Sequence, residues 1–239
     1  MTGRRALVTG GSRGIGRAIA LGLAAQGVRV AACHVNPDSG AGLAEQLEPV
    51  GGFVARADVT NPADVDTLAG AVRDRFGGLE ILVNNAGVNS HHPVTDLEPA
   101  EWHRVLDSNL TAAYLVTRAM APLLAEGAVV VNISSAVALV GQPGIAHYTA
   151  AKAGILGLTR TLSKELGPRQ IRVNALSPGV VETDQAAGAS PERKAAIAAR
   201  TALGRLGRPE DVAGACLLLV SDLACFVTGA NVAVDGGIT

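Results

Sequence analysis

A glycine-rich loop near the N-terminus is the feature that most restricts the fold of this chain. Residues 5–8, with the apolar run Ala6-Leu7-Val8, have the pattern of a buried strand. They continue directly into Thr9-Gly10-Gly11-Ser12-Arg13-Gly14-Ile15-Gly16 and then into a helical pattern. Such a turn lets the backbone approach a pyrophosphate, because glycine has no side chain and the following helix begins with unpaired N–H groups. We therefore predict a dinucleotide-binding turn, with a structural turn that binds nothing as the alternative.

Short β-branched runs alternate with longer helical patterns along the rest of the chain. Further strands are predicted at 29–33, 53–57, 81–83, 129–133, 172–175 and 231–234. Helices are predicted at 15–26, 39–47, 62–76, 99–124, 148–166 and 209–219. Most of the strands are continuously apolar, which is typical of a sheet covered on both faces. This order predicts an α/β fold, a single domain over residues 1–239 with a Rossmann-type doubly wound parallel sheet of about seven strands and helices on both faces.

The segment 183–207 departs from this regular order. It is rich in alanine, glycine and serine, and Ser190-Pro191-Glu192 has the pattern of a helix start. Long irregular segments in such domains often cover a binding site. We predict a substrate lid at 183–207, with an ordinary surface helix as the alternative.

Charge, apolar content and cysteine spacing exclude several classes of protein. The 20 Lys and Arg residues are balanced by 21 Asp and Glu residues, so no basic surplus points to nucleic acid or to an anionic membrane. No apolar stretch approaches the roughly 18 residues of a membrane span, and the apolar run 6–8 is too short for a signal peptide. Cys33, Cys216 and Cys225 have no CxxC spacing, so we expect reduced thiols in a cytoplasmic protein.

The histidines do not have the spacing of a metal site. His91 and His92 are adjacent, and no cluster of Cys, Asp or Glu at metal-ligand spacing accompanies them, so we expect no bound metal. His147 begins a helical pattern, and we expect its side chain to face solvent or the rim of a substrate site.

Tyr148 and Lys152 are four residues apart in a helical pattern, which places both side chains on one face of the helix. A free tyrosine has a pKa of about 10, and a nearby ammonium lowers that pKa, so the pair could transfer a proton at working pH. Ser134 and Ser135 follow the preceding strand, where a hydroxyl could bind a substrate oxygen. The alternative is a surface pair without chemistry.

Taken in order, these motifs resemble the short-chain dehydrogenase/reductase family over essentially the whole chain. The resemblance implies a nicotinamide-dependent oxidoreductase in which Asn109, Ser135, Tyr148 and Lys152 are catalytic. It selects Ser135 over Ser134, and it implies that Asn109 holds a water that relays protons to Lys152. The matching segments are the Thr-Gly-x-x-x-Gly-x-Gly loop, Asp58-Val59, Asn84-Asn85-Ala86-Gly87, Asn109, Ser135 with Tyr148-x-x-x-Lys152, Pro178-Gly179 and Thr183.

The resemblance also places the cofactor along the ends of the predicted strands. It implies contacts from the glycine loop, from the ends of the second, third and fourth strands, from the Tyr148 helix and from the segment 178–183. The implied contact residues are Gly10, Ser12, Arg13, Gly14, Ile15, Gly16, His34, Asp58, Val59, Asn85, Ala86, Gly87, Tyr148, Lys152, Pro178, Gly179, Val181 and Thr183.

The end of the second predicted strand indicates which nicotinamide cofactor binds. NAD enzymes often carry an acid there, whereas the matching residue here is His34 and the next acid is Asp38. Arg13 lies inside the glycine loop, where its guanidinium could pair with a 2′-phosphate through two hydrogen bonds. Both positions favour NADPH over NADH.

Within the family, the resemblance is closest to the reductases of 3-oxoacyl thioesters carried on a carrier protein or on CoA. Segments 177–184, 205–212 and 228–237 support it. It implies NADPH-dependent reduction of a 3-oxoacyl thioester to the 3-hydroxy product, with Tyr148 as the proton donor. The alternatives are an NAD(P)-dependent alcohol or polyol dehydrogenase, a generic carbonyl reductase and a non-catalytic NADPH-binding scaffold.

Two expectations about partners follow from the resemblance. Carrier-protein reductases present basic residues at two surface spots; Arg169 matches one, whereas the other reads Ala125-Glu126-Gly127-Ala128 and lacks a base, so carrier docking stays open. The family commonly forms homotetramers through its long central helices, and the predicted helix 99–124 carries apolar residues suited to such packing. These are Leu106, Leu110, Ala113, Leu115 and Val116.

Overall fold

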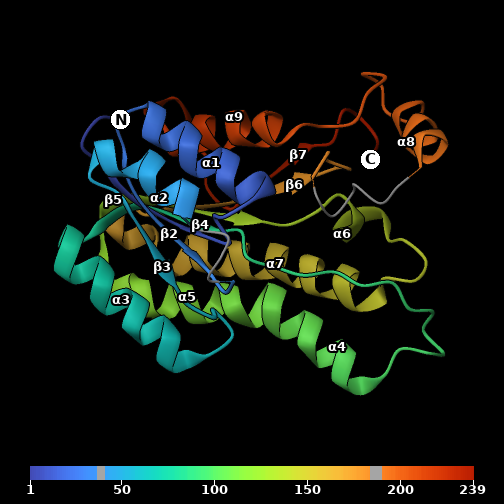
Figure 1. Ribbon diagram of the computed structural model, residues 1–239, viewed down its shortest axis with the longest axis horizontal. Coiled ribbons are helices and arrows are strands. Elements are labelled where there is room, and N and C mark those ends of the chain that lie inside the picture. Colours follow the sequence, from blue (N-terminus) through green and yellow to red (C-terminus); the bar gives the residue numbers. More distant parts are fainter. Residues whose placement is uncertain (37–40, 184–189) are drawn as a thin grey trace.

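Seven parallel strands form one sheet in the computed structural model, which describes residues 1–36, 41–183 and 190–239 (Figure 1). Their order across the sheet is β3-β2-β1-β4-β5-β6-β7. The predicted α/β class and doubly wound parallel sheet are confirmed. The strands are β1 (Arg5–Thr9), β2 (Arg29–His34), β3 (Phe53–Arg56), β4 (Leu79–Asn84), β5 (Leu124–Ile133), β6 (Arg172–Pro178) and β7 (Asn231–Val234).

Helices cover both faces of the sheet, because each connection between parallel strands must cross over it. The helices are α1 (Gly14–Ala25), α2 (Ala41–Leu47), α3 (Pro62–Phe76), α4 (Pro99–Leu106), α5 (Ala112–Met120), α6 (Val137–Val140), α7 (Ala146–Glu165), α8 (Pro191–Ala198) and α9 (Pro209–Val220). Helices α1, α2 and α9 lie on one face, and α3, α5 and α7 lie on the other (Figure 1). None of the described helices is both long and apolar enough to cross a membrane.

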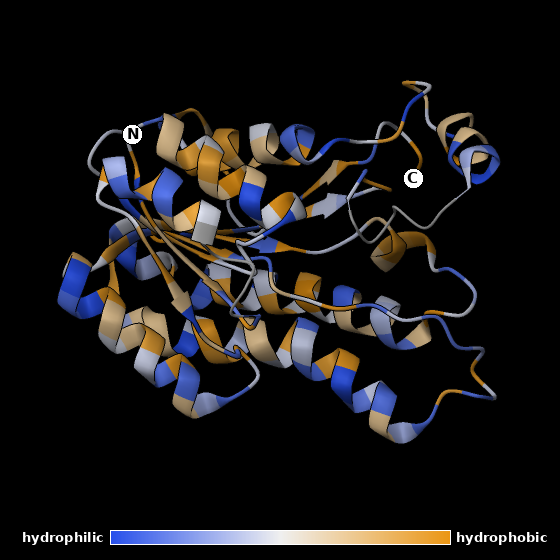
Figure 2. Ribbon diagram, viewed as in Figure 1, coloured by the Kyte–Doolittle hydropathy of each residue, from blue (hydrophilic) through white to orange (hydrophobic). Residues whose placement is uncertain are grey.

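Alternate residues of each strand contribute to the apolar cores on the two faces of the sheet. In β1, Ala6 and Val8 pack toward α1 and α9, whereas Leu7 packs toward α3 and α5. Figure 2 shows apolar strands at the centre of the molecule and polar residues on the outer helix surfaces. This burial of both faces explains why the predicted strands are continuously apolar rather than alternating.

The predicted helix 99–124 differs most from the structure. Helix α4 ends at Leu106, a π-helical turn follows at Asp107–Thr111, and α5 then ends at Met120. A 3₁₀ turn at Ala121–Leu123 contains Pro122, which has no N–H to continue a helix, and the next residue already belongs to β5. Short helix α6 was not predicted, because four residues are too few to show a helical period.

The candidate site lies where the strand order reverses. Strands β1 and β4 are neighbours in the sheet, but β1 continues toward α1 on one face and β4 toward α4 on the other. Loops that diverge in this way leave a crevice beyond the carboxyl ends of the strands. The loops after Thr9 and Asn84 therefore form the two sides of this crevice.

Candidate active site

In the glycine loop, the backbone of Gly10 lies close to the backbone of Gly16 in the first turn of α1. Gly10 and Gly14 have φ of +64° and +53°, a region that L side chains rarely adopt. A Cβ on Gly16 would lie 2.3 Å from the carbonyl oxygen of Gly10, so a larger residue does not fit there. Within the described chain, α1 begins without a side-chain cap and without an acidic residue in its first turn. Its N-terminal N–H groups are therefore suited to bind an anion such as a pyrophosphate.

Asn85 connects the glycine loop to the loop after β4. Its side-chain amide donates to the carbonyl oxygens of Thr9 and Gly10 at 3.0 and 3.1 Å. The backbone N–H groups of Asn85 and Ala86 both donate to the Thr9 hydroxyl, at 3.0 and 3.1 Å. These contacts bring together two segments that the sequence assigned to cofactor binding.

The neighbouring Asn84 has a structural position instead. Its side chain is buried and donates to Thr117 Oγ1 at 2.9 Å and to Asn132 Oδ1 at 2.8 Å. It therefore connects β4 with α5 and β5 below the crevice. The sequence motif contained both asparagines, and only the structure separates their two positions.

The ends of β2 and β3 form the side of the site assigned to the adenosine end of the cofactor. Asp58 Oδ1 accepts hydrogen bonds from the Thr60 N–H and hydroxyl, so the carboxylate also stabilises its own turn. Arg56 is paired with His34 across the sheet and lines the same surface depression as Asp58. Arg56 was not among the residues predicted from the sequence, although its place near the end of the predicted strand 53–57 could have indicated it.

Tyr148 and Lys152 lie on α7, with the Lys152 ammonium 5.5 Å from the centroid of the Tyr148 ring. Lys152 is only 3% exposed, and its Nζ donates to the carbonyl oxygen of Ile133 at 2.8 Å. Burial lowers the pKa of Lys152 to about 8, because the ammonium loses water contacts. This proximity agrees with the arrangement expected from the spacing.

The phenol of Tyr148 is held in its protonated form by its surroundings. Burial raises the pKa of Tyr148, and a hydrogen bond with Ser135 opposes that rise. This direction is opposite to the lowered pKa expected from the sequence, because burial disfavours the charged phenolate. A protonated phenol is the form that can donate a proton to a carbonyl oxygen.

The two serines after β5 have different partners. Ser134 is buried, and its hydroxyl donates to the carbonyl oxygen of Lys152 at 2.8 Å, so it connects β5 to α7. The Ser135 side chain instead lies at the phenol of Tyr148. Ser135 is therefore the serine placed to contact a substrate oxygen.

Asn109 lies in the π-helical turn between α4 and α5. Its amide nitrogen donates to the carbonyl oxygens of Val88 and Val105, at 2.7 and 2.9 Å. Its Oδ1 is buried and has no hydrogen-bond partner among the described residues. A Cβ on Gly87 would lie 2.3 Å from this oxygen and 3.5 Å from Lys152 Nζ. The oxygen is thus positioned to accept a hydrogen bond from a water near Lys152.

The segment after β6 reaches back to the glycine loop. The Gly179 N–H donates to Val234 O at 3.1 Å, and Val181 pairs with Gly207. A Cβ on Gly14 would lie 3.3 Å from Thr183 Cγ2, so Thr183 lies beside the glycine loop. Part of the predicted lid, 184–189, lies outside the described residues, and the lid at 183–207 stays a prediction.

The His147 side chain does not face solvent or an open rim, the two positions expected from the sequence. Its side chain is fully buried between α7 and the loop after β4, with Nε2 2.8 Å from Ser90 Oγ. The expectation was wrong because α7 packs against α4, a contact between segments far apart in the sequence. The described residues contain no group of three or more His, Cys, Asp or Glu side chains that could hold a metal ion.

Comparisons with known proteins agree with this geometry. A family model described as "Enoyl-(Acyl carrier protein) reductase" matches residues 10–239. A 3-oxoacyl-[acyl-carrier-protein] reductase of Synechocystis sp. is 38% identical, over 100% of this chain and 98% of its own length. The 3-oxoacyl-[acyl-carrier-protein] reductase FabG of Escherichia coli K12 is 36% identical, over 99% of this chain and 97% of its own.

Solved structures give the same result. A dehydrogenase/reductase from Sinorhizobium meliloti 1021 superposes with a TM-score of 0.94 at 37% identity, covering 100% of this chain and 96% of that one. A blue fluorescent protein from a metagenomic library, solved in complex with NADPH, has a TM-score of 0.93 at 34% identity, covering 100% of this chain and 98% of that one.

Proposed function

Because the chain belongs to the short-chain dehydrogenase/reductase family, we propose that it is an NADPH-dependent reductase of 3-oxoacyl thioesters. It reduces the 3-oxo group to the 3-hydroxy group. The observation that carries this proposal is the grouping of three side chains at the edge of the sheet where α1 begins uncapped: the Tyr148 phenol lies at Ser135, and the Lys152 ammonium is 5.5 Å from the Tyr148 ring.

Each side chain of the site has a separate role in the proposed reaction. A bound NADPH supplies the hydride. The Ser135 hydroxyl donates a hydrogen bond to the substrate oxygen, and the Tyr148 phenol donates the proton that this oxygen takes up. Lys152 stabilises the phenolate that remains, because its ammonium lies near the ring. Asn109 Oδ1 holds a water from which the proton is replaced.

The cofactor contacts named from the sequence are part of this proposal. The glycine loop and the N-terminus of α1 bind the pyrophosphate, and Asn85 to Gly87, with the segment Pro178–Thr183, surround the nicotinamide. Arg13 is exposed at the start of α1, where a 2′-phosphate at the end of β2 is within the expected reach of its guanidinium. His34 and Arg56 end the two strands on that side.

We expect kcat/KM with NADPH to exceed kcat/KM with NADH. Replacement of Arg13 by alanine is expected to reduce that ratio by about tenfold, because it removes a charge-assisted hydrogen bond to the 2′-phosphate. Arg17→Ala is the matched control, since Arg17 also lies on α1 but donates to Gln46. Steady-state kinetics with both cofactors give the ratio; a wild-type preference for NADH would contradict the proposal.

Two surface positions, Arg169 and Glu126, indicate whether the acyl group is carried by a protein or by CoA. Arg169 donates to the carbonyl oxygens of Ala121 and Leu124, so its guanidinium already serves the turn before β5. Glu126 stands at the second expected basic spot and carries the opposite charge. These positions favour recognition of the thioester itself over docking of an acidic carrier.

The substrate is tested by NADPH oxidation with acetoacetyl-CoA, a carrier-protein thioester and simple diketones. We expect the CoA thioester to be reduced with a kcat/KM similar to that of the carrier-bound thioester. Activity with diketones alone would support a generic carbonyl reductase. Oxidation of polyols with NADP⁺, without thioester reduction, would support the alternative dehydrogenase.

We also propose that the chain forms a homotetramer. The family resemblance supports this, and so does a group of exposed apolar side chains beyond α9, where Phe226 is fully exposed and Leu223 is 85% exposed. Light scattering is expected to give a mass near four times the 24.1 kDa of one chain. A mass equal to a single chain would refute the tetramer.

The state of the cysteines indicates the cellular compartment in which the protein works. Cys33 and Cys216 are buried, Cys225 is exposed, and all three are free. Free thiols, one of them exposed, are typical of a reducing compartment, and we therefore propose the cytoplasm.

A further inference from the structure

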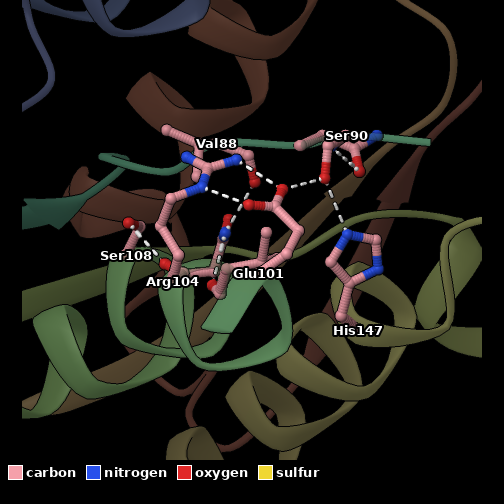
Figure 3. A network of polar contacts seen from close by, with 9 residues as sticks. Val88, Ser90, Glu101, Arg104, Ser108 and His147 are labelled. Atoms are coloured by element: carbon pink, nitrogen blue, oxygen red, sulfur yellow. Dashed lines mark hydrogen bonds and ion pairs between the residues drawn. The ribbon is translucent and has the colours of Figure 1, made fainter. Parts of the chain in front are cut away.

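A network of polar side chains joins the loop after β4, helix α4 and the first turn of α7 (Figure 3). The Ser90 hydroxyl donates to Glu101 Oε1, and it also lies 2.8 Å from His147 Nε2. Arg104, one turn after Glu101 on α4, donates to both carboxylate oxygens at 2.7 Å. His147 is the residue immediately before Tyr148. The network is thus adjacent to the proposed proton donor without forming part of it.

The charges and donors in this network allow one arrangement of protons. Hydrogen bonds from Arg104 and Ser90 lower the pKa of Glu101 to about 2, so this group is a carboxylate that only accepts. Ser90 has a single hydroxyl proton and gives it to Glu101, so its oxygen must accept from His147. His147 therefore carries a proton on Nε2. Because burial lowers the pKa of His147, the ring is the neutral imidazole, with a lone pair on Nδ1.

The hydrogen bond between Ser90 and His147 anchors the N-terminus of α7, which has no side-chain cap among the described residues. Helix α7 begins after Ile145 without a side-chain hydrogen bond to cap it, as far as the described residues show. The His147 side chain instead anchors the first turn to Ser90, and the His92 N–H donates to Gly144 O at 2.7 Å just before the helix. These two contacts connect the turn that carries Tyr148 to the loop after β4.

We propose that Ser90 and His147 are positioning residues for Tyr148. The hydrogen bond between them sets where the first turn of α7 lies, and this turn sets where the phenol meets the substrate oxygen. Glu101 orients the Ser90 hydroxyl so that its oxygen faces His147. The expected effect on the reaction rate rests on the proposed function. The position of Tyr148, however, can be measured without any substrate.

Protonation of His147 would keep the Nε2 donor to Ser90 and add a second N–H on Nδ1. That N–H would be buried without an acceptor among the described residues, which destabilises the packed position of the ring. The charged groups that face the ring are Glu101 and Arg104 from α4 and His92 from the loop; burial, His92 and Arg104 lower the pKa of His147, and Glu101 raises it. The pKa thus lies below 6.5, so the neutral imidazole persists through neutral pH and is lost only in more acidic solution.

The position of Tyr148 is tested by NMR of protein labelled with ¹³C at tyrosine Cζ. The chain has only two tyrosines, so two signals are expected, and Tyr114→Phe assigns them. Ser90→Ala is expected to shift the Tyr148 signal and leave that of Tyr114 in place, and Ser90→Thr is expected to restore the wild-type spectrum. Ser163→Ala is the control, because its hydroxyl donates to Arg160 O on the same helix. An unchanged Tyr148 signal in Ser90→Ala would overturn the proposal.

Kinetics give a second, independent readout. Ser90→Ala is expected to lower kcat about tenfold with little change in KM for NADPH, because a displaced donor slows the chemical step while the glycine loop and Asn85 are unaltered. Protonation of His147 is expected to lower kcat of the wild-type protein in acid. His147→Gln has no side chain that titrates at this position, so this fall of kcat is expected to disappear. Equal loss of kcat in Ser90→Ala and Ser90→Thr would contradict the proposal. Inactive wild-type protein would refute the proposed function and leave the NMR result to decide this inference.

Discussion

Replacement of Tyr148 by phenylalanine is expected to lower kcat for ketone reduction by about 10²–10⁴-fold, the usual contribution of a general acid. Phenylalanine keeps the ring and removes only the hydroxyl, so the fold around α7 is preserved. NADPH binding is expected to stay within a small factor of wild type, since the glycine loop and Asn85 are untouched. Steady-state kinetics and a direct titration of NADPH with each protein measure the two quantities separately.

Tyr114→Phe is the matched control for this variant. Tyr114 lies on α5 and is 48% exposed, and it is the only other tyrosine in the chain. The control should keep full activity. Near-normal turnover of Tyr148→Phe would exclude Tyr148 as the proton donor.

Replacement of Gly16 by alanine is expected to raise KM for NADPH by more than about tenfold and to lower the free energy of unfolding by about 1–3 kcal/mol. The new Cβ would lie 2.3 Å from the backbone oxygen of Gly10 and 2.4 Å from the side-chain nitrogen of Asn85. Backbone cannot move aside as a flexible side chain does, so the start of α1 must shift away from the loop. This shift displaces the N–H groups proposed to bind the pyrophosphate.

Gly22→Ala, on the same helix, separates this effect from helix propensity. A Cβ on Gly22 meets nothing nearer than Leu217 Cδ1 at 3.5 Å, which is ordinary contact. Alanine is expected to stabilise the protein there by up to about 1 kcal/mol and to leave KM unchanged. Chemical denaturation and cofactor kinetics measure both variants. A Gly16→Ala protein with wild-type KM and stability would contradict the close approach of the loop.

Much of the fold was predictable because its signals are local. Each buried strand is a short apolar run, and the glycine loop follows β1 directly, so the parallel sheet and the turn between β1 and α1 could be predicted from neighbouring residues. The helix break at the π-helical turn was not predictable in this way. Residues 99–121 have a continuous helical composition, and the turn that orients Asn109 is stabilised by its contact with the Val88 carbonyl in another loop.

The limits of prediction within the site have the same cause. The burial of His147 depends on α4 and on Ser90, which is 57 residues earlier in the chain. The pKa direction of Tyr148 depends on desolvation, which spacing to Lys152 does not reveal. Ser134 and Ser135 are indistinguishable by residue type, and only their partners, the Lys152 carbonyl and the Tyr148 phenol, separate them.

Transfer of a labelled hydride tests directly whether the protein reduces a 3-oxoacyl thioester with NADPH. Acetoacetyl-CoA is incubated with the wild-type protein and NADPH that carries deuterium on the reactive face of its nicotinamide, and the product is examined by mass spectrometry. We predict 3-hydroxybutyryl-CoA with a single deuterium bound to carbon 3, and formation of this product by Tyr148→Phe at a rate at least about 100-fold lower under the same conditions. Absence of the deuterated product with wild-type protein, or its formation at the same rate by Tyr148→Phe, would contradict the account.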